Sequence, residues 1–168
     1  VSTNGVPIIT SERAYRGANL TDFNEMMGFP ANQLTTAYWF PWYDASNFMK
    51  TYLVIGNAST DAVNQPSASV DVYIHGVKRH TYTVPYGGRE VHFDAGLADG
   101  PVRVVSTNGV PIITSERAYR GPNLTDFNEM MGFPADQLTT EYWFPWYDAT
   151  NFMQTYLVIG NASTDAVN

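Results

Sequence analysis

The chain has 168 residues, of which 44% are hydrophobic and 14% aromatic, a composition that supports a compact core and argues against disorder. Its formal net charge is −7 with only nine Lys and Arg residues, which disfavours nucleic-acid binding because phosphate recognition needs clustered basic side chains. It has no cysteine, which excludes disulfides and thiolate metal sites, and no apolar run long enough to span a membrane as a helix.

The sequence repeats itself after 104 residues. Residues 1–64 return as residues 105–168 without an insertion. A period of this length is too long for a solenoid motif and matches one small domain, so it indicates an array of tandem domains. The two copies differ at five positions, which are Ala18/Pro122, Asn32/Asp136, Ala37/Glu141, Ser46/Thr150 and Lys50/Gln154.

Short runs rich in Val, Ile, Tyr, Thr and Phe, separated by Gly, Pro, Asn and Asp, predict β-strands along the whole chain. Hairpin turns are expected at 76–78 and at Asn108-Gly109, the strongest two-residue hairpin pattern in the sequence. About seven strands in about 100 residues favour an all-β, immunoglobulin-like β-sandwich. In chain order, the predicted strands are 37–43, 50–55, 69–75, 79–84, 90–94, 101–106 and 111–119.

The segment 123–138 lacks the alternation of a strand and predicts a short helical turn between domains. Thr125 is a suitable helix N-cap and Gly132 a suitable stop. We place a domain boundary here, which makes 35–138 one complete β-sandwich repeat. Residues 1–34 are then the C-terminal strands and linker of a preceding repeat, and residues 139–168 the N-terminal strands of a following one.

The two end segments lack any counterpart of 65–104, so they cannot sum to a second complete domain. Alone, each would leave strand edges unpaired and apolar side chains exposed. We therefore expect a long repeating assembly, in which either one long chain continues through such units or neighbouring chains complete the ends. A fragment with frayed ends is the alternative.

Three stretches of the complete unit carry a resemblance to a known family. They contain the turn Gly56-Asn57-Ala58, the turn 84–89 before a strand, and the strand 106–117. The unit resembles the uncharacterised immunoglobulin-like tandem repeats of large secreted bacterial surface proteins. It departs from them at Ala58 and Ala162, where proline is usual, and in its aromatic richness. The resemblance implies a sandwich fold and an extracellular or cell-surface location, and it implies no activity.

The sequence YWFPWYD is the most unusual feature and occurs at 38–44 and 142–148. Pro41 prevents this segment from pairing as a regular central strand. Its aromatic side chains have three possible uses: they fill the core, seal one domain against the next, or form a platform for sugar rings. The candidate contact residues are Trp39, Phe40, Trp42, Tyr43, Trp143 and Trp146.

Metal and glycan sites have only weak support. Asn57, Ser59 and Asp61 place oxygen atoms at alternate positions, as a calcium loop does, but lack its glycine and distal glutamate, and turn chemistry explains them more simply. A metal-binding pair of His75 and His80 across the predicted hairpin is a further possibility, and solvated strand positions are the simpler reading. Four sequons place formal glycan acceptors at Asn19, Asn57, Asn123 and Asn161.

No nucleophile–base pair, zinc-protease motif or phosphate loop occurs, so no enzymatic activity and no cofactor are expected. Glu116-Arg117 suggests a structural ion pair. An isopeptide crosslink based on Lys50 cannot be general, because the next copy has Gln154. The sequence thus favours a structural repeat of a long extracellular fibre, stalk or adhesin shaft. The alternative is a carbohydrate- or surface-binding adhesin module whose exposed aromatics contact glycans, with repetition adding avidity.

Overall fold

Strands make up nearly all of the regular structure in the computed structural model, which describes residues 1–46, 48–121, 123–150 and 152–164. The all-β prediction is therefore confirmed. The strands are β1 (Ser11–Arg16), β2 (Asp22–Met27), β3 (Ala37–Phe40), β4 (Tyr43–Asp44), β5 (Met49–Asn57), β6 (Ala68–Ile74), β7 (Val77–Val84), β8 (Arg89–His92), β9 (Ala98–Asp99), β10 (Val102–Ser106), β11 (Ile112–Arg120), β12 (Asp126–Met131) and β13 (Phe133–Pro134).

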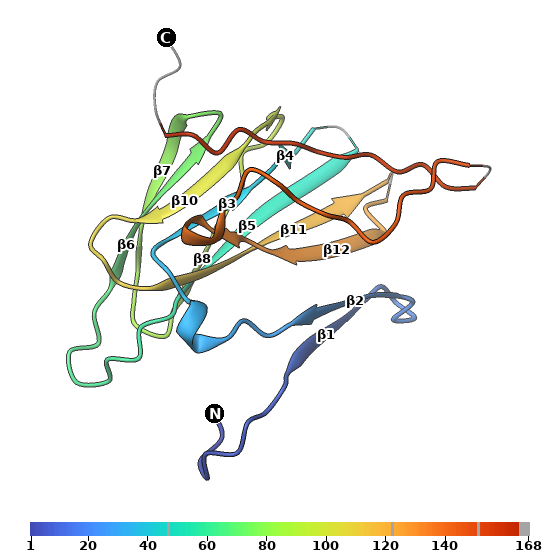
Figure 1. Ribbon diagram of the computed structural model, residues 1–168. Helices are drawn as coiled ribbons and strands as arrows, with labels where there is room; N and C mark the ends of the chain where they lie inside the picture. The colour runs from blue at the N-terminus through green and yellow to red at the C-terminus, as the bar shows by residue number, and fades with distance from the viewer. Residues whose placement is uncertain (47, 122, 151, 165–168) are drawn as a thin grey trace.

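Two antiparallel sheets enclose the core in a β-sandwich-like arrangement (Figure 1). One sheet has the strand order β13-β3-β10-β6-β7 and the other β12-β11-β5-β8, while β4 and β9 form a small separate pair. Alternate residues of each strand point inward, which is why the core consists of every second side chain. The buried apolar residues are Tyr38, Phe40, Tyr43, Ala45, Leu53, Ile55, Ala68, Val70, Val72, Ile74, Val84, Val102, Val104, Val110 and Ile112.

The hairpin predicted between the third and fourth strands is present. Strands β6 and β7 pair with Ile74 opposite Val77, so the turn is His75-Gly76, one residue earlier than expected. Both turn residues have positive φ, 53° and 70°, as the two-residue hairpin turn that suits twisted strands requires.

The hairpin predicted at Asn108-Gly109 is wrong. Strands β10 and β11, on either side of it, lie in different sheets and do not pair with each other. The Asn108 side chain explains the difference, because it accepts a hydrogen bond from the Ser69 backbone N–H and donates one to the Ser67 carbonyl. The turn is thus tied to the start of β6 and carries the chain across the core from one sheet to the other.

The helical turn predicted to begin after Thr125 is also wrong, because residues 126–131 form strand β12, antiparallel to β11. The Glu129 carboxylate pairs with the Arg117 guanidinium at 2.6 Å, a cross-strand contact invisible in the local sequence. Gly132 serves close packing: a Cβ there would lie 2.9 Å from the Phe40 ring. In the described part of the chain, the helical residues are two 3-10 turns, Ala31–Gln33 and Ala135–Gln137, so the segment 123–138 does contain a short helical turn, at its end and not after Thr125.

The N-terminal copy, by which we mean residues 1–34, repeats this hairpin but lacks the neighbouring strand that β11 has. Strands β1 and β2 pair in the register that β11 and β12 use, one repeat earlier. The matching ion pair is present as well, between Arg13 and Glu25 at 2.7 Å. However, β11 also pairs with β5, whereas β1 and β2 form an isolated two-stranded sheet.

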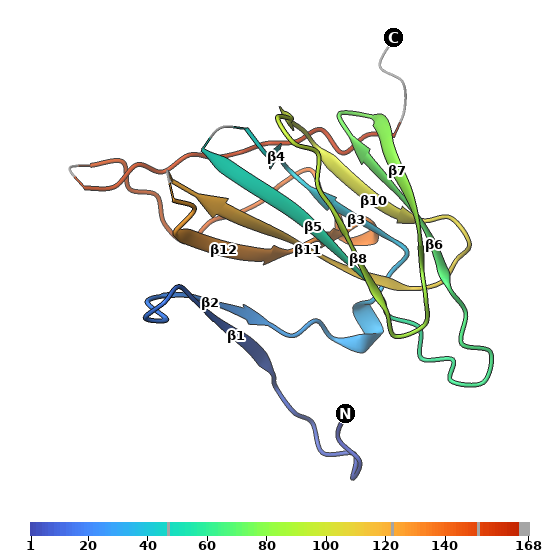
Figure 2. The same ribbon diagram turned by 180° about the vertical axis from the view of Figure 1, so that it is seen from behind.

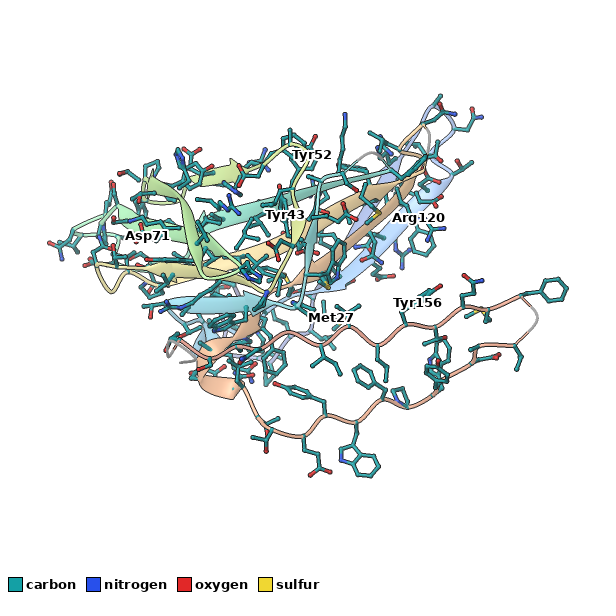
Figure 3. All side chains as sticks on the ribbon, turned by 90° about the horizontal axis from the view of Figure 1, so that it is seen from above. Met27, Tyr43, Tyr52, Asp71, Arg120 and Tyr156 are labelled. Atoms are coloured by element: carbon teal, nitrogen blue, oxygen red, sulfur yellow. The ribbon has the colours of Figure 1, made fainter. Side chains whose placement is uncertain are left out.

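The C-terminal copy, by which we mean the described part of residues 139–164, does not form the strands of its counterpart. The described part of residues 139–164 contains no strand, although its counterpart at 35–60 forms β3, β4 and β5. Figure 3 shows this segment as an extended layer beside the sandwich. Figures 1 and 2 place it and the β1–β2 hairpin on opposite sides of β12. The structure thus contains one closed sandwich, and no second complete unit lies among the described residues.

Candidate functional site

The aromatic stretch that follows Thr36 divides between the core and the outer surface. Phe40 and Tyr43 are each 1% exposed and belong to the core, as does Tyr38. Trp39 and Trp42 are only half-buried, because the alternation of β3 turns Trp39 to the outer face and Pro41 interrupts the strand before Trp42. Core filling therefore accounts for part of the motif and leaves the two tryptophans for another use.

A row of large side chains crosses the outer face of the five-stranded sheet. The strand register places Phe133, Trp39, Arg103, Tyr73 and Lys78 next to one another on β13, β3, β10, β6 and β7. The Arg103 guanidinium lies 5.9 Å from the Trp39 ring centre and 5.7 Å from that of Tyr73. These are cation–π distances, so Arg103 links the two rings into one platform.

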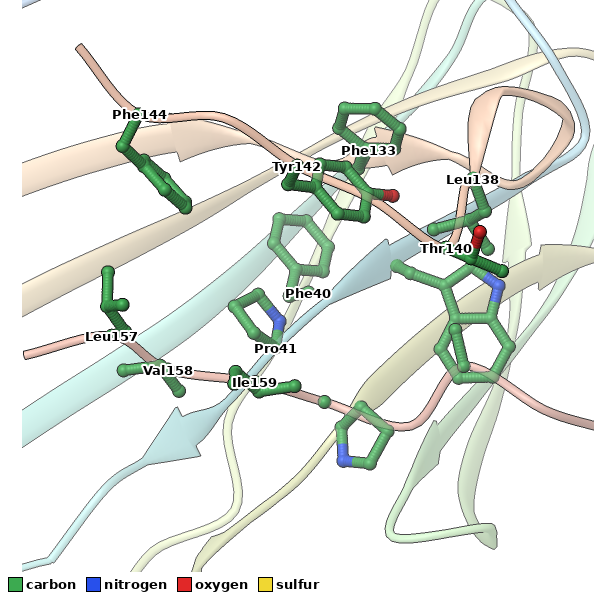
Figure 4. Close-up of a pocket in the computed structure, with 14 residues that line it drawn as sticks. Phe40, Pro41, Phe133, Leu138, Thr140, Tyr142, Phe144, Leu157, Val158 and Ile159 are labelled. Carbon is green, nitrogen blue, oxygen red and sulfur yellow. The ribbon is translucent and has the colours of Figure 1, made fainter.

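Residues 138–144 and 157–162 lie beside Trp39 and, with the sandwich, enclose an apolar groove of about 510 Å³ (Figure 4). The walls come from two sources, the β3–β13 edge of the sandwich and the C-terminal copy. The groove is lined by Trp39, Phe40, Pro41, Pro101, Phe133, Leu138, Thr140, Tyr142, Phe144, Leu157, Val158, Ile159, Gly160 and Ala162.

The C-terminal copy packs closely on the sandwich at Tyr142 and at Gly160. The Tyr142 ring packs edge-on against Phe133, with ring centres 5.8 Å apart. Gly160 lies so close to the proline pair that a Cβ there would meet the Pro101 Cβ at 2.9 Å and the Pro41 Cα at 3.1 Å. Only glycine permits this approach without displacing the backbone of Pro41.

A more polar groove of about 870 Å³ adjoins the first one and includes Trp42 in its wall. Its lining includes Arg103 and Tyr73, and also His75, whose Nδ1 lies 2.9 Å from the Asp99 carboxylate. Asn161 of the C-terminal copy closes another side. Both predicted tryptophan contacts, Trp39 and Trp42, therefore face the following repeat segment, whereas Trp143 and Trp146 are 87% and 60% exposed.

The same residues have opposite exposure in the two copies. Phe40, Leu53 and Ile55 are at most 1% exposed, yet their counterparts Phe144, Leu157 and Ile159 are 68%, 59% and 89% exposed. The N-terminal copy shows the same change, since Ile112 is fully buried and Ile8 is 62% exposed. These side chains are of core type in both places, and the difference lies in whether neighbouring strands cover them.

A buried polar cluster joins the free edges of the two sheets. His92 Nδ1 lies 3.1 Å from the Tyr82 hydroxyl, and His92 Nε2 lies 3.5 Å from the Asp94 carboxylate. The Asp94 backbone N–H donates to the Tyr43 hydroxyl at 2.7 Å. Desolvation lowers the pKa of His92 and raises the pKa of Tyr43 to about 12, so both side chains are neutral near pH 7. The hydrogen bond between Tyr82 and the neutral His92 therefore links β7 to β8.

Glu116 is the least expected residue of the core. It is 1% exposed, and neither carboxylate oxygen has a hydrogen-bond partner. Burial raises the pKa of Glu116 to about 8, because a charged carboxylate cannot be solvated there. The predicted structural ion pair therefore involves Arg117, which binds Glu129, while Glu116 remains unpaired and protonated at neutral pH.

The weak calcium candidates form a turn. The Asn57 amide donates to the carbonyls of Pro66 and Val84, and its oxygen accepts from the Ser59 backbone N–H. Asp61 accepts from the backbone N–H groups of Val63 and Asn64. Within the described ranges, no group of three or more His, Asp or Glu side chains is arranged to hold a metal.

The remaining predicted sites are scattered. His75 lies at a hairpin turn beside Asp99. His80 packs on Tyr82, with ring centres 4.2 Å apart. The histidine ring that His80 contacts is that of His92. Of the four sequon asparagines, Asn19, Asn123 and Asn161 are exposed, whereas Asn57 is 8% exposed and fully hydrogen-bonded. Asn57 is therefore the least accessible of the four sequon asparagines.

Sequence reasoning missed Arg103 and Phe133, because their place beside Trp39 depends on strands that pair across more than 60 residues. Comparison with protein-family models, with curated proteins and with solved structures found no match. No helix in the described part of the chain is long and apolar enough to cross a membrane.

Proposed function

We propose that this chain is a structural repeat of a long extracellular fibre, stalk or adhesin shaft, in which tandem immunoglobulin-like units provide reach and mechanical cohesion. One observation carries this proposal: identical core side chains are buried in 35–138 and exposed in the flanking copies. Burying each of them completely would contribute about 1.5–3 kcal/mol. The flanking segments thus have the composition of sandwich strands but lack the neighbouring strands that would cover their core side chains.

The aromatic platform supports a role at the joint between units. Trp39, Arg103 and Tyr73 line grooves whose other walls come from the following copy. Apolar burial at such a joint would limit bending between neighbouring units. A glycan-binding role has less support, since the following copy already lies over the two half-buried tryptophans. No catalytic step is part of the proposed role, and the extracellular location rests on the resemblance of the turn and strand motifs.

An extended chain tests this proposal. Continuing the sequence past residue 168 with a copy of residues 65–138 would supply the missing strands. We expect a second sandwich, seen as an unfolding enthalpy that roughly doubles and as protease resistance across residues 139–164. A scrambled version of the added segment is the control. An extended chain that unfolds with the original enthalpy and is still cleaved in 139–164 would refute the tandem-unit role.

A further inference from the structure

Strand β1 has a free edge. It pairs with β2 on one side, and its other side has no strand partner among the described residues. Its twin β11 uses that same side to pair with β5 along nine residues, from Ile112 opposite Asn57 to Arg120 opposite Met49. The molecule therefore shows which strand this edge accepts and in which register.

That strand is present a second time in the chain. Residues 153–161 repeat β5, with Gln154 in place of Lys50 as the single difference. They are extended but unpaired, and Leu157 and Ile159 are exposed where Leu53 and Ile55 are buried. The described residues thus include a free edge of the β11 type and an unpaired segment of the β5 type.

We propose that residues 153–161 of one molecule add as a third strand to the β1–β2 hairpin of a second copy of this chain. The internal register places Ala14 opposite Thr155, as Ala118 lies opposite Thr51. The inference rests on the proposed repeat function and names the partner and the strand pairing through which units would join. Such strand addition relies on main-chain hydrogen bonds for affinity and on alternate side chains for register.

Core composition supports this pairing. Eight of the fifteen buried apolar side chains of the sandwich have counterparts in the flanking segments that contain these strands, six in residues 139–164 and two in residues 1–34. The six include the equivalents of all three core aromatics, Tyr142, Phe144 and Tyr147. The second sheet would also begin to form, because the β13–β3 register predicts Phe29 opposite Trp143.

The geometry favours a second molecule as the partner. The β1–β2 hairpin lies against β12, where the Asn24 amide donates to the Glu129 carbonyl and the Arg16 guanidinium lies over the Tyr119 ring. Residues 138–144 and 157–162 line a groove together with Trp39, Pro41 and Pro101, at the edge of the other sheet. Figures 1 and 2 show the two segments separated by β12. A chain in which these two segments do not pair with each other has both available for another copy, and a heterologous contact of this kind builds either a ring or an open filament.

A cysteine crosslink in the full 168-residue chain tests the register. The chain has no cysteine, so Ala14→Cys with Thr155→Cys gives each molecule only these two thiols. Directly paired residues of an antiparallel ladder are close enough for this bond. Under mild oxidation at high protein concentration, we expect covalent dimers and a ladder of larger species on non-reducing gels, falling at least tenfold in yield on hundredfold dilution.

Two matched variants complete the experiment. Thr51→Cys with Ala118→Cys places the same pair inside the sandwich and should give a crosslinked monomer at every concentration. Ala14→Cys with Gln154→Cys shifts the register by one residue and should give no ladder. A ladder of equal yield from the shifted pair would show unspecific association. A crosslinked monomer from Ala14 and Thr155 would overturn the second-copy partner while leaving the repeat role intact, and no crosslink at all would overturn the pairing. The extended chain decides the repeat role separately.

Discussion

At the scale of single residues, Glu116 shows how strongly burial changes a side chain whose sequence neighbours are fixed. Glu116 and Glu12 occupy equivalent positions within identical strands, SERAYR. Glu12 is exposed, whereas Glu116 is 1% exposed with both oxygens unpartnered. The difference comes entirely from β5 and the opposite sheet, which cover β11 and are missing around β1.

Glu116 makes stability depend on pH. Its folded pKa of about 8 lies above the ordinary value of 4.5, so the folded state holds a proton that the unfolded state releases. Its contribution is therefore fully present below pH 4.5 and is lost as the pH rises toward 8, at up to about 1.4 kcal/mol per pH unit. We expect Glu116→Gln to remove this loss, so that the variant exceeds the natural chain in free energy of unfolding by several kcal/mol at pH 8.5 and by little at pH 4.5. Denaturant titrations across this pH range measure the free energy of unfolding of both proteins, and Glu12→Gln is the control. If the free energy of unfolding changed with pH in the same way for Glu116→Gln and the natural chain, a buried, unpaired carboxyl would be contradicted.

Local side-chain contacts are the part of the structure that depends least on the surrounding fold. The Tyr38 hydroxyl accepts from the Thr35 backbone N–H at 3.2 Å, and Tyr142 repeats this contact with Thr139 at the same distance. The turn bonds of Asp44 also return at Asp148. These contacts span two or three residues and form with or without a surrounding sandwich. The Arg103 platform and the Glu116 site depend on strands that are distant in the sequence, so no local sequence pattern predicts them.

At the scale of elements, the two identical hairpins differ in how deeply their ion pairs are buried. Arg13 pairs with an exposed Glu25, and Arg117 pairs with Glu129, whose side chain is 5% exposed. Removing one partner of a buried pair leaves an unsatisfied charge, whereas an exposed carboxylate is solvated by water.

This difference predicts unequal effects of one substitution made in both hairpins. Arg117→Ala should lower the free energy of unfolding of the sandwich by about 2–4 kcal/mol. Arg13→Ala should leave the melting temperature unchanged, because Glu25 is already exposed to solvent. Calorimetry of the two single variants measures this, and equal losses would show that the β1–β2 hairpin is buried in solution.

The errors of sequence-based prediction also belong to the element scale. Asn108-Gly109 has the composition of a hairpin turn, but the Asn108 side chain bonds to the β6 entry and directs the chain to the other sheet. Strand β12 was hidden because its sequence DFNEMM mixes polar and apolar residues, and its stabilising partner Arg117 lies on β11. Strand existence follows from local composition, while strand pairing is decided by long-range contacts.

At the scale of the whole molecule, the repeat makes the chain a controlled comparison of one sequence in two settings. Residues 49–57 form the nine-residue strand β5 between β11 and β8, whereas residues 153–161 remain unpaired. The period of the sequence predicts this equivalence directly. Which copy closes into a sandwich follows from the presence of 65–104, which supplies β6, β7, β8, β9 and most of β10. Fold completion is therefore a property of neighbouring strands and not of the repeated segment itself.

Hydrogen exchange of these twin segments tests that claim most directly. Peptic peptides covering 49–57 and 153–161 are distinguishable in the mass spectrometer, because Lys50 is replaced by Gln154. In dilute solution we expect the amides of 49–57 to be strongly protected and those of 153–161 to exchange at nearly the rate of an unfolded chain, with protection appearing in 153–161 as the protein concentration rises. Equal protection of both segments in a dilute monomer would show that one molecule satisfies its own strands, and would contradict the account.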